Sequence, residues 1–372
     1  MIHKMNKRIL KNMEWEVAIY AIALSIIGII ALFSATASTE YDEFQKQIVW
    51  LCVGIVAMIV AMIVDYDIIV KFSPILYAIS IILLIVVLFT KSINGASSWF
   101  KIGDFALQPG EISKVFVILF LSFVVSKIQE SRKEEINNFF KLMLVLLVMG
   151  IPVALIIKQP DYGTAAAFLF ATAGILFVSG INKRYIICTL LIIIIGVPLV
   201  YKFVLPDHAK TRIDVFLNPE SDPKGSGYNV IQSKIAIGSG ELTGMGLLKG
   251  NQTQLGYLYP KTTDFIFAVI GEEMGFVIAA LVIFLNILLI TKSIYIAKTA
   301  KDNVGSYIAM GITGIFLFHM LENIGMTMGL LPITGVPLLF ISYGGSSMIT
   351  SFLCIGLLLN ISGRRQKAIF VK

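Results

Sequence analysis

Charged residues are scarce in this chain of 372 residues, because Asp, Glu, Lys and Arg together make up only 14% of it. In soluble domains about a quarter of the residues are charged, so this composition excludes a soluble globular protein of this size. Hydrophobic residues make up 57% of the chain, and the mean hydropathy is +0.86. We therefore expect most of the protein surface to face lipid.

Cysteine is also scarce. Cys52, Cys188 and Cys354 lie in apolar stretches without metal-ligand spacing, which predicts buried thiols and neither a disulfide nor a zinc site. Basic residues outnumber acidic ones by 30 to 23, but membrane topology explains this excess and no nucleic-acid partner is expected. The first apolar stretch has no small-residue cleavage site, so we interpret it as a spanning helix and not as a cleaved signal.

Apolar runs long enough to cross a bilayer recur along the chain. A hydrocarbon core about 30 Å thick requires roughly 17 to 25 helical residues. The expected spans are 17–35, 48–64, 74–90, 112–126, 142–157, 164–179, 185–205, 265–290, 307–330 and 336–361. The fourth of these is the shortest and weakest. The predicted fold is an all-α polytopic membrane protein with ten transmembrane helices, forming a single domain over residues 1–372.

The distribution of Lys and Arg predicts the orientation, because short cytoplasmic loops retain positive charge. With the N-terminus inside, most of the 30 basic residues fall on the cytoplasmic side. The short outer loops then contain only Lys46, Lys91, Lys101 and Lys158. Only an even number of spans agrees with this distribution of Lys and Arg. Both termini are therefore expected in the cytoplasm, with residues 206–263 forming a large extracytoplasmic loop between the seventh and eighth helices.

The large loop contains its own structural signals. Residues 230–237 (VIQSKIAI) have the spacing of a short amphipathic helix suited to a membrane interface. Glycines follow it, and they indicate either a backbone that turns close to a ligand or simple turns. These are Gly238, Gly240, Gly244, Gly246 and Gly250. No internal repeat is evident, which disfavours an inverted-repeat transporter.

Ionisable residues inside spanning segments are costly and suggest functional sites. Glu111 and Lys114 stand at i and i+3 in the fourth helix, where they share a face and can neutralise each other as a structural or a functional pair. Asp161 precedes the sixth helix, and helix capping alone would explain it. Trp99, in the outer loop 91–110, is in a position typical of an aromatic belt anchor.

The eighth helix is expected to begin at Asp264, directly after the large loop. A helix N-terminus stabilises a carboxylate as an anion, and a general base needs the same ionised state. Two turns further on, one of Glu272 and Glu273 is expected to face the bundle and to pair with a cation.

The ninth helix contains a polar cluster. His319, Glu322 and Asn323 share one face, and further metal ligands are missing from the pattern. This arrangement favours a buried hydrogen-bonded cluster over a metal site.

Several long segments together resemble one family. They are GASSWFKIG (95–103), QPGEISK (108–114), QPDYGTA (159–165), FLNPESDPKGSGYNVIQSKIAIGSG (216–240), TDFIFAVIGEEMGF (263–276), NIGMTMGLLPITGVPLLFISYGGSS (323–347) and NISGRR (360–365). They closely resemble the SEDS family of peptidoglycan glycosyltransferases over nearly the whole chain. QSKIAIGSG, TQLGYL (253–258) and NIGM are more similar to the elongation-type, RodA-like branch than to the division-type, FtsW-like branch.

The resemblance implies polymerisation of lipid II on the outer face of the cytoplasmic membrane. It implies that Asp264, in the TDF motif, is catalytic, and it places Glu111, Lys114, Asp161 and Trp99 in the substrate site. It also implies a class B penicillin-binding protein as partner, docked on the eighth and ninth helices. The family often reads LPExHTDF where this chain reads LYPKTTDF, with Lys261 and Thr262 near the places of the Glu and the His; Gly110 in place of Ser is a minor departure.

The mechanism expected from this resemblance is an inverting displacement. Asp264 deprotonates the acceptor hydroxyl, which attacks the anomeric carbon of the growing chain and expels a lipid pyrophosphate. Lys114, supported by Arg212, Lys210 or a divalent cation such as Mg²⁺ or Mn²⁺, would stabilise the leaving group. Two alternatives stay open: a lipid II flippase, which needs a continuous polar path, and a non-catalytic scaffold for the penicillin-binding protein.

Overall fold

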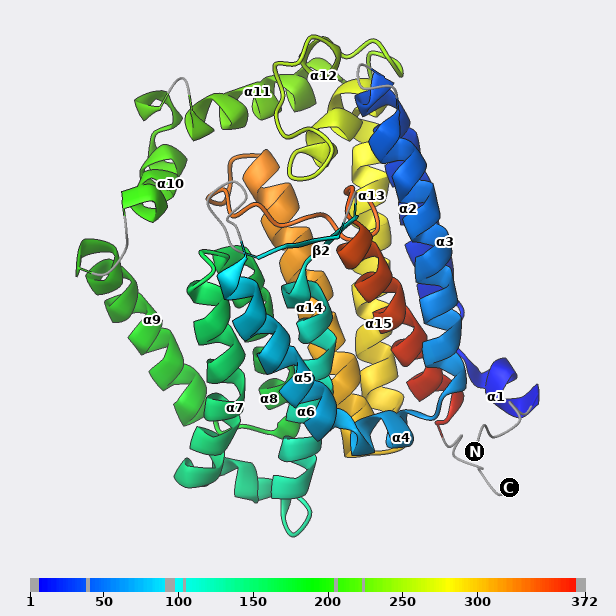
Figure 1. The fold of residues 1–372 in the computed structure, drawn as a ribbon, viewed down its shortest axis with the longest axis vertical. Coiled ribbons are helices and arrows are strands. Elements are labelled where there is room, and N and C mark those ends of the chain that lie inside the picture. Colours follow the sequence, from blue (N-terminus) through cyan, green and yellow to red (C-terminus); the bar gives the residue numbers. More distant parts are fainter. Residues whose placement is uncertain are drawn as a thin grey trace.

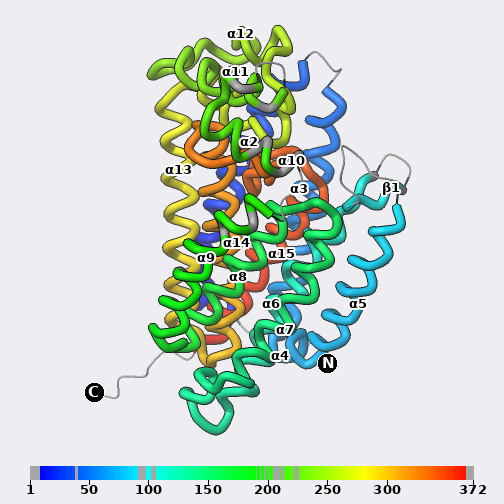
Figure 2. The backbone as a smooth tube through the Cα atoms, turned by 90° about the vertical axis from the view of Figure 1, so that its left-hand side faces the viewer, coloured from blue at the N-terminus to red at the C-terminus, as the bar shows by residue number. Residues whose placement is uncertain are grey.

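The computed structural model describes residues 7–37, 41–90, 98–102, 105–203, 207–222 and 225–365. The long helices run side by side as one bundle (Figure 1). At one end of it lie α1 (Lys7–Asn12), α4 (Tyr66–Lys71) and the end of α15 (Gly345–Gly363). Two views place α11 (Ser226–Ser239) and α12 (Asn251–Gln254) at the opposite end (Figures 1 and 2). The segments near both termini therefore share one end of the bundle.

Each predicted span coincides with a helix. They are α2 (Glu16–Ala35), α3 (Asp42–Ile63), α5 (Ser73–Val86), α6 (Pro109–Ile128), α7 (Phe139–Ile157), α8 (Tyr162–Ser179), α9 (Lys183–Phe203), α13 (Ile266–Thr299), α14 (Asn303–Thr327) and α15. Eight helices in the described residues are long and apolar enough to cross a bilayer, namely α2, α3, α7, α8, α9, α13, α14 and α15. The multi-pass helical fold is thus confirmed, while the count of ten stays a prediction.

Short elements connect these helices. They are η2 (Val87–Phe89), which continues α5, the antiparallel hairpin of β1 (Phe100–Ile102) and β2 (Phe105–Leu107), η3 (Lys133–Asn137), α10 (Asp207–Leu217) and η4 (Pro219–Ser221). In the hairpin, Phe100 pairs with Leu107, so the chain reverses just before α6. Lys91, one of the basic residues counted in the predicted orientation, lies outside the described part of the structure.

The centre of the bundle is formed by α14 and α15. Two thirds of the apolar window of α14 and 78% of that of α15 are buried, against none of α9. Small residues allow α14 to touch α8 directly. A Cβ atom added to Gly314 would lie 2.5 Å from the carbonyl oxygen of Phe170, and one added to Gly174 would lie 2.7 Å from that of Met310. Such close backbone packing is typical of helices in membranes, and it fixes α8 against α14.

Two of the long helices, α13 and α15, differ from the prediction. Helix α15 begins at Gly345 and not at residue 336, so residues 328–344 are irregular. Helix α13 is broken at Gly275, whose φ of 78° is not helical. The loop 241–246 satisfies the broken turn: Met245 N donates to Glu272 O (2.9 Å), Gly246 N to Glu273 O (3.0 Å), and Phe276 N to Glu241 O (2.9 Å).

The glycines of the large loop allow it to pack on α13. A Cβ atom would lie 1.8 Å from the carbonyl oxygen of Gly271 if added to Gly240, and 2.2 Å from that of Glu273 if added to Gly244. Backbone contact with α13 therefore explains these two glycines without a ligand. The short helix expected at residues 230–237 is confirmed as part of α11, which lies across the end of the bundle (Figure 1).

Ion pairs gather at the opposite end of the bundle. Glu14 contacts Lys292 at the end of α13 (2.9 Å) and Arg365 after α15 (2.6 Å). Arg364 pairs with Asp65 (3.1 Å). The NISGRR segment thus ties α2, α4, α13 and α15 together where the sequence places the cytoplasm.

The three cysteines are free, and only Cys354 is buried as predicted. Cys52 and Cys188 are exposed on α3 and α9, so the prediction was wrong for them. Apolar sequence does not by itself imply burial in a bilayer protein, because an apolar side chain can equally face lipid.

We expect Gly240→Ala to destabilise the protein, because its Cβ would enter the backbone of α13 at 1.8 Å from Gly271 O. The φ of Gly240, −75°, suits alanine, so the effect would be purely steric. Overpacking of this kind costs about 1–3 kcal/mol. The matched control is Gly238→Ala in the last turn of α11, the helix that Gly240 caps, where a Cβ meets nothing within 4 Å. Thermal unfolding in detergent should show a lower midpoint for Gly240→Ala only; equal midpoints would contradict the proposed packing.

Candidate active site

Several of the predicted site residues lie around one irregular segment between α14 and α15, residues 333–337 (ITGVP), called here the strap. The side chain of Asn323 is fully buried, and its Nδ2 atom donates to the carbonyl oxygens of Val336 (2.8 Å) and Asp264 (3.0 Å). Gly335 has a φ of 75°, and a Cβ atom there would lie 3.3 Å from Oδ2 of Asp264. Asn323 therefore joins the strap to Asp264, and the Asp264 carboxylate lies beside Gly335.

Asp264 lies just before α13, which begins at Ile266, two residues later than the prediction. The segment before it is held from two sides. Ser342 Oγ donates to the carbonyl oxygen of Thr263 (2.7 Å), and Tyr343 N donates to that of Thr262 (2.9 Å). The half-exposed Asp264 thus stands on a fixed backbone beside a helix N-terminus, where a carboxylate is favoured as an anion.

The predicted pair of Glu111 and Lys114 is present and buried. Lys114 Nζ donates to Glu111 Oε1 (2.8 Å) and lies 3.0 Å from His319 Nε2, while His319 Nδ1 lies 2.9 Å from the carbonyl oxygen of Pro337. Glu111 is 2% exposed, and Lys114 and His319 are each 1% exposed. Lys114 therefore presents almost no surface to a ligand in this conformation. The polar cluster predicted on α14 is confirmed.

Asp161 caps α8, as its position predicted: its Oδ1 atom accepts from Thr164 N at 3.0 Å. Its Oδ2 atom accepts from Gln108 Nε2 (2.8 Å), and Gln108 N donates to Ser346 Oγ at the start of α15 (3.0 Å). A Cβ atom on Gly163 would lie 2.4 Å from Val336 Cγ1, so the start of α8 also touches the strap. Asp161 is thus joined to α6, to α15 and to the Asp264 region.

The structure does not bring Trp99 into this cluster. Trp99 is half-exposed and directly precedes β1, and the hairpin continues from β2 into Gln108. Arg212 belongs to α10, but its side chain lies outside the described part of the structure. Lys210, on the same helix, is half-exposed.

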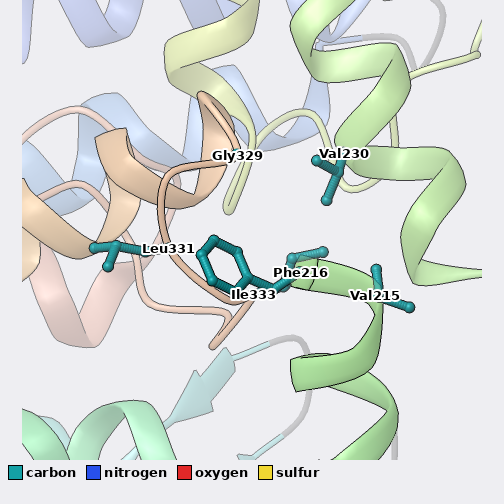
Figure 3. A pocket seen from close by; sticks show the side chains of 6 residues that line it. All are labelled: Val215, Phe216, Val230, Gly329, Leu331 and Ile333. Carbon is teal, nitrogen blue, oxygen red and sulfur yellow. The ribbon is translucent and has the colours of Figure 1, made fainter. Parts of the chain in front are cut away.

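A small apolar pocket lies between the large loop and the segment that follows α14 (Figure 3). It is lined by Val215, Phe216, Val230, Gly329, Leu331 and Ile333. The exposed Lys234 on α11 stands beside it, because a Cβ atom on Gly329 would lie 2.6 Å from Lys234 Nζ. The end of the bundle that carries the large loop therefore combines an apolar surface with a cation that the sequence did not single out.

Glu272 and Glu273 differ from the prediction, because they lie beside α12 at the loop end of the bundle and neither pairs with a cation in the described residues. Glu272 accepts from Gln252 N (2.7 Å) and Thr253 N (3.0 Å), and Glu273 accepts from Gly250 N (3.2 Å). These donors are the N–H groups at the start of α12, which have no partner within that helix.

Lys261, one of the departures from the family motif, completes this attachment by donating to the carbonyl oxygen of Thr253 (2.8 Å). Burial lowers the pKa of Lys261, and the carboxylates of Glu273 and Glu43 partly oppose this effect. Lys261 therefore helps to hold the loop, and it touches the backbone of α12.

The described structure is thus a multi-pass helical bundle with a half-exposed carboxylate, Asp264, just before α13. Comparison with known proteins identifies its class. The chain belongs to the family of cell cycle proteins named after FtsW, RodA and SpoVE, which it matches over residues 14–367.

The chain is similar to curated members of both branches of that family. It is 32% identical to the peptidoglycan glycosyltransferase RodA of Treponema pallidum, covering 97% of this chain and 100% of that protein. It is 36% identical to the peptidoglycan glycosyltransferase MrdB of Escherichia coli, covering 93% and 92%. Identity to a probable peptidoglycan glycosyltransferase FtsW of Trichlorobacter lovleyi is 35%, covering 92% and 91%.

Solved structures share this fold. A chain from a peptidoglycan synthase complex that coordinates polymerization and crosslinking superposes with a TM-score of 0.80 at 28% identity, covering 94% of this chain and 97% of that one. RodA of Thermus thermophilus superposes with a TM-score of 0.71 at 24% identity, covering 95% and 98%. The chain is therefore a multi-pass protein of a bacterial cytoplasmic membrane with a RodA-like fold.

We expect Asn323→Leu to be strongly destabilising, because it removes both donors that hold Asp264 and Val336. Each buried carbonyl left without a partner costs about 1–3 kcal/mol. The matched control is Thr313→Val, a buried substitution on the same helix that removes one bond to the carbonyl oxygen of Ala309. Thermal unfolding should separate the two variants clearly. A loss for Asn323→Leu no larger than that for the control would show that the strap does not depend on this side chain.

Proposed function

We propose that this chain is a peptidoglycan glycosyltransferase that polymerises lipid II into β-1,4-linked glycan strands on the outer face of the cytoplasmic membrane, in the service of cell elongation. One observation carries the proposal: the half-exposed Asp264 stands on a backbone fixed by Asn323 and Ser342, at the end of the bundle that the large loop covers. The relatives named peptidoglycan glycosyltransferase support the reaction class.

In the proposed reaction Asp264 is the general base. Its carboxylate takes the proton of the 4-hydroxyl of the acceptor N-acetylglucosamine, and the oxygen attacks the anomeric carbon of the N-acetylmuramic acid at the reducing end of the growing chain. The bond from that carbon to the pyrophosphate breaks, and undecaprenyl pyrophosphate leaves. An α-linked donor then gives a β-1,4 bond with inversion. A positioned base contributes about 100- to 10,000-fold in rate.

The leaving pyrophosphate needs positive charge. Because Lys114 is buried, we assign direct contact to the basic residues of the large loop. Lys234 and Lys210 are the described candidates, and Arg212 is kept as a candidate from the sequence. A divalent cation, Mg²⁺ or Mn²⁺, would supply further charge when bound to the pyrophosphate. In the described residues no three His, Cys, Asp or Glu side chains gather, which favours a cation carried by the substrate.

For the topology we propose ten spans with both termini in the cytoplasm. The ion pairs of Glu14, Arg364 and Arg365 support the assignment of that end to the cytoplasm, and the position of α11 and α12 supports an extracytoplasmic large loop (Figure 1). The proposed partner is a class B penicillin-binding protein docked on α13 and α14. The similarity to a chain from a peptidoglycan synthase complex that coordinates polymerization and crosslinking supports a partner of this kind.

The alternatives make different demands on the molecule. A lipid II flippase needs a polar path across the membrane, whereas Glu111, Lys114, His319 and Asn323 all lie in the turns of α6 and α14 nearest the Asp264 end. A scaffold without activity needs no base, and would retain its effect on a partner after loss of the Asp264 carboxylate.

The direct test is Asp264→Asn in purified protein supplied with lipid II. We expect the yield of glycan polymer to fall by about 100- to 10,000-fold, because the amide accepts no proton. The control is Asp42→Asn, which makes the same charge change on an exposed carboxylate in the first turn of α3. Polymer of unchanged yield and length from Asp264→Asn would exclude the proposed base and leave the scaffold reading.

A further inference from the structure

The buried groups Glu111, Lys114 and His319 make a chain of contacts that the proposed reaction does not use. Its direction follows from which atoms can donate. An ammonium group has only donors, so Lys114 requires an acceptor at His319 Nε2. The neutral ring then has its proton on Nδ1, which donates to the carbonyl oxygen of Pro337. His319 thus links the ion pair on α6 to the strap by hydrogen bonds.

The strap is in turn the support of Asp264. Asn323 lies one helical turn after His319 on α14 and donates to the neighbouring carbonyl oxygen, that of Val336, and to Asp264 O. Two consecutive strap carbonyls, at residues 336 and 337, are therefore held by one face of α14. Gly335, the preceding strap residue, is the one that lies against the Asp264 carboxylate. A displacement of Pro337 would therefore also displace the carboxylate of Asp264.

We infer that His319 is a positioning residue for the glycosyl transfer: it locks the strap, and with it Asp264, to the Glu111–Lys114 pair on α6. This inference rests on the proposed function of Asp264. The inference also assigns a role to the buried ion pair. Lys114 holds His319 in place and does not contact the substrate. Buried ion pairs contribute little net stability, so their value here lies in fixed geometry. Displacement of a reacting group by about 1 Å can reduce a rate by about 100-fold.

Two substitutions separate the two bonds of the ring. Asparagine places an amide nitrogen near the position of Nδ1, so His319→Asn keeps the bond to Pro337 and loses Lys114. Glutamine places an amide oxygen near the position of Nε2, so His319→Gln keeps Lys114 and loses the bond to Pro337. His319→Phe loses both bonds. We expect kcat for lipid II polymerisation to fall by about 100-fold in His319→Phe and by about 10-fold in each amide variant, with KM within about threefold of wild type.

Three measurements exclude a merely structural role. The rates are taken per folded molecule, as judged by thermal unfolding in detergent, and Thr313→Val on the same helix is the control with unchanged kcat. In the double variant of Lys114→Met with His319→Phe, the loss should equal that of the more damaging single variant, since both act through one chain of contacts. In an Asp264→Asn background, His319→Phe should lower the residual rate no further.

The outcomes distinguish this inference from the proposed function. If Asp264→Asn abolishes polymerisation but the His319 variants keep wild-type kcat, the inference about His319 is wrong. The assignment of Asp264 as the general base is then retained. The inference is also overturned if the His319 variants change only KM. It is overturned as well if the falls in kcat of His319→Phe and Lys114→Met multiply in the double variant. If Asp264→Asn retains full activity, the proposed function itself fails.

Discussion

A bilayer interior offers no water to backbone N–H and C=O groups, so any non-helical chain inside the bundle must find its partners in the protein. This constraint shapes the half of the molecule that carries the large loop. The irregular segment between α14 and α15 is tolerated because His319, Asn323 and Ser342 bind its backbone or that of the segment before α13. The side chains that stabilise this irregular chain are therefore also those that fix Asp264 in place.

The break in α13 follows the same rule with different partners. Gly275 interrupts the helix, and the backbone of residues 241–246 takes over the bonds that the helix loses. Glu272 and Glu273, next to the break, accept from the first N–H groups of α12. The large loop is thus built into the bundle as a substitute for helical hydrogen bonds.

Local signals in the sequence were sufficient for a large part of this structure. Helix positions follow from runs of apolar residues, the Glu111–Lys114 pair follows from an i, i+3 spacing, and the cap at Asp161 follows from its place before α8. Prediction was least accurate where distant segments meet. The start of α15 was placed nine residues too early, because residues 336–344 are as apolar as a helix although the strap occupies part of them. Glu272 and Glu273 were expected to meet a cation, since no local pattern reveals loop N–H groups as their partners.

By itself, then, the sequence determined that this is a membrane protein. It also determined the positions of the helices along the chain and the carboxylate that stands at the end of the large loop. These properties depend on composition and on spacing within one helix, which do not require knowledge of the fold. Only the tertiary structure decided which groups act together. The contact of Lys114 with His319 joins residues 205 positions apart, and that of Asn323 with Asp264 joins residues 59 apart. Such pairs arise because α6, α13 and α14 pack side by side, and packing is a property of the assembled bundle that no single segment encodes.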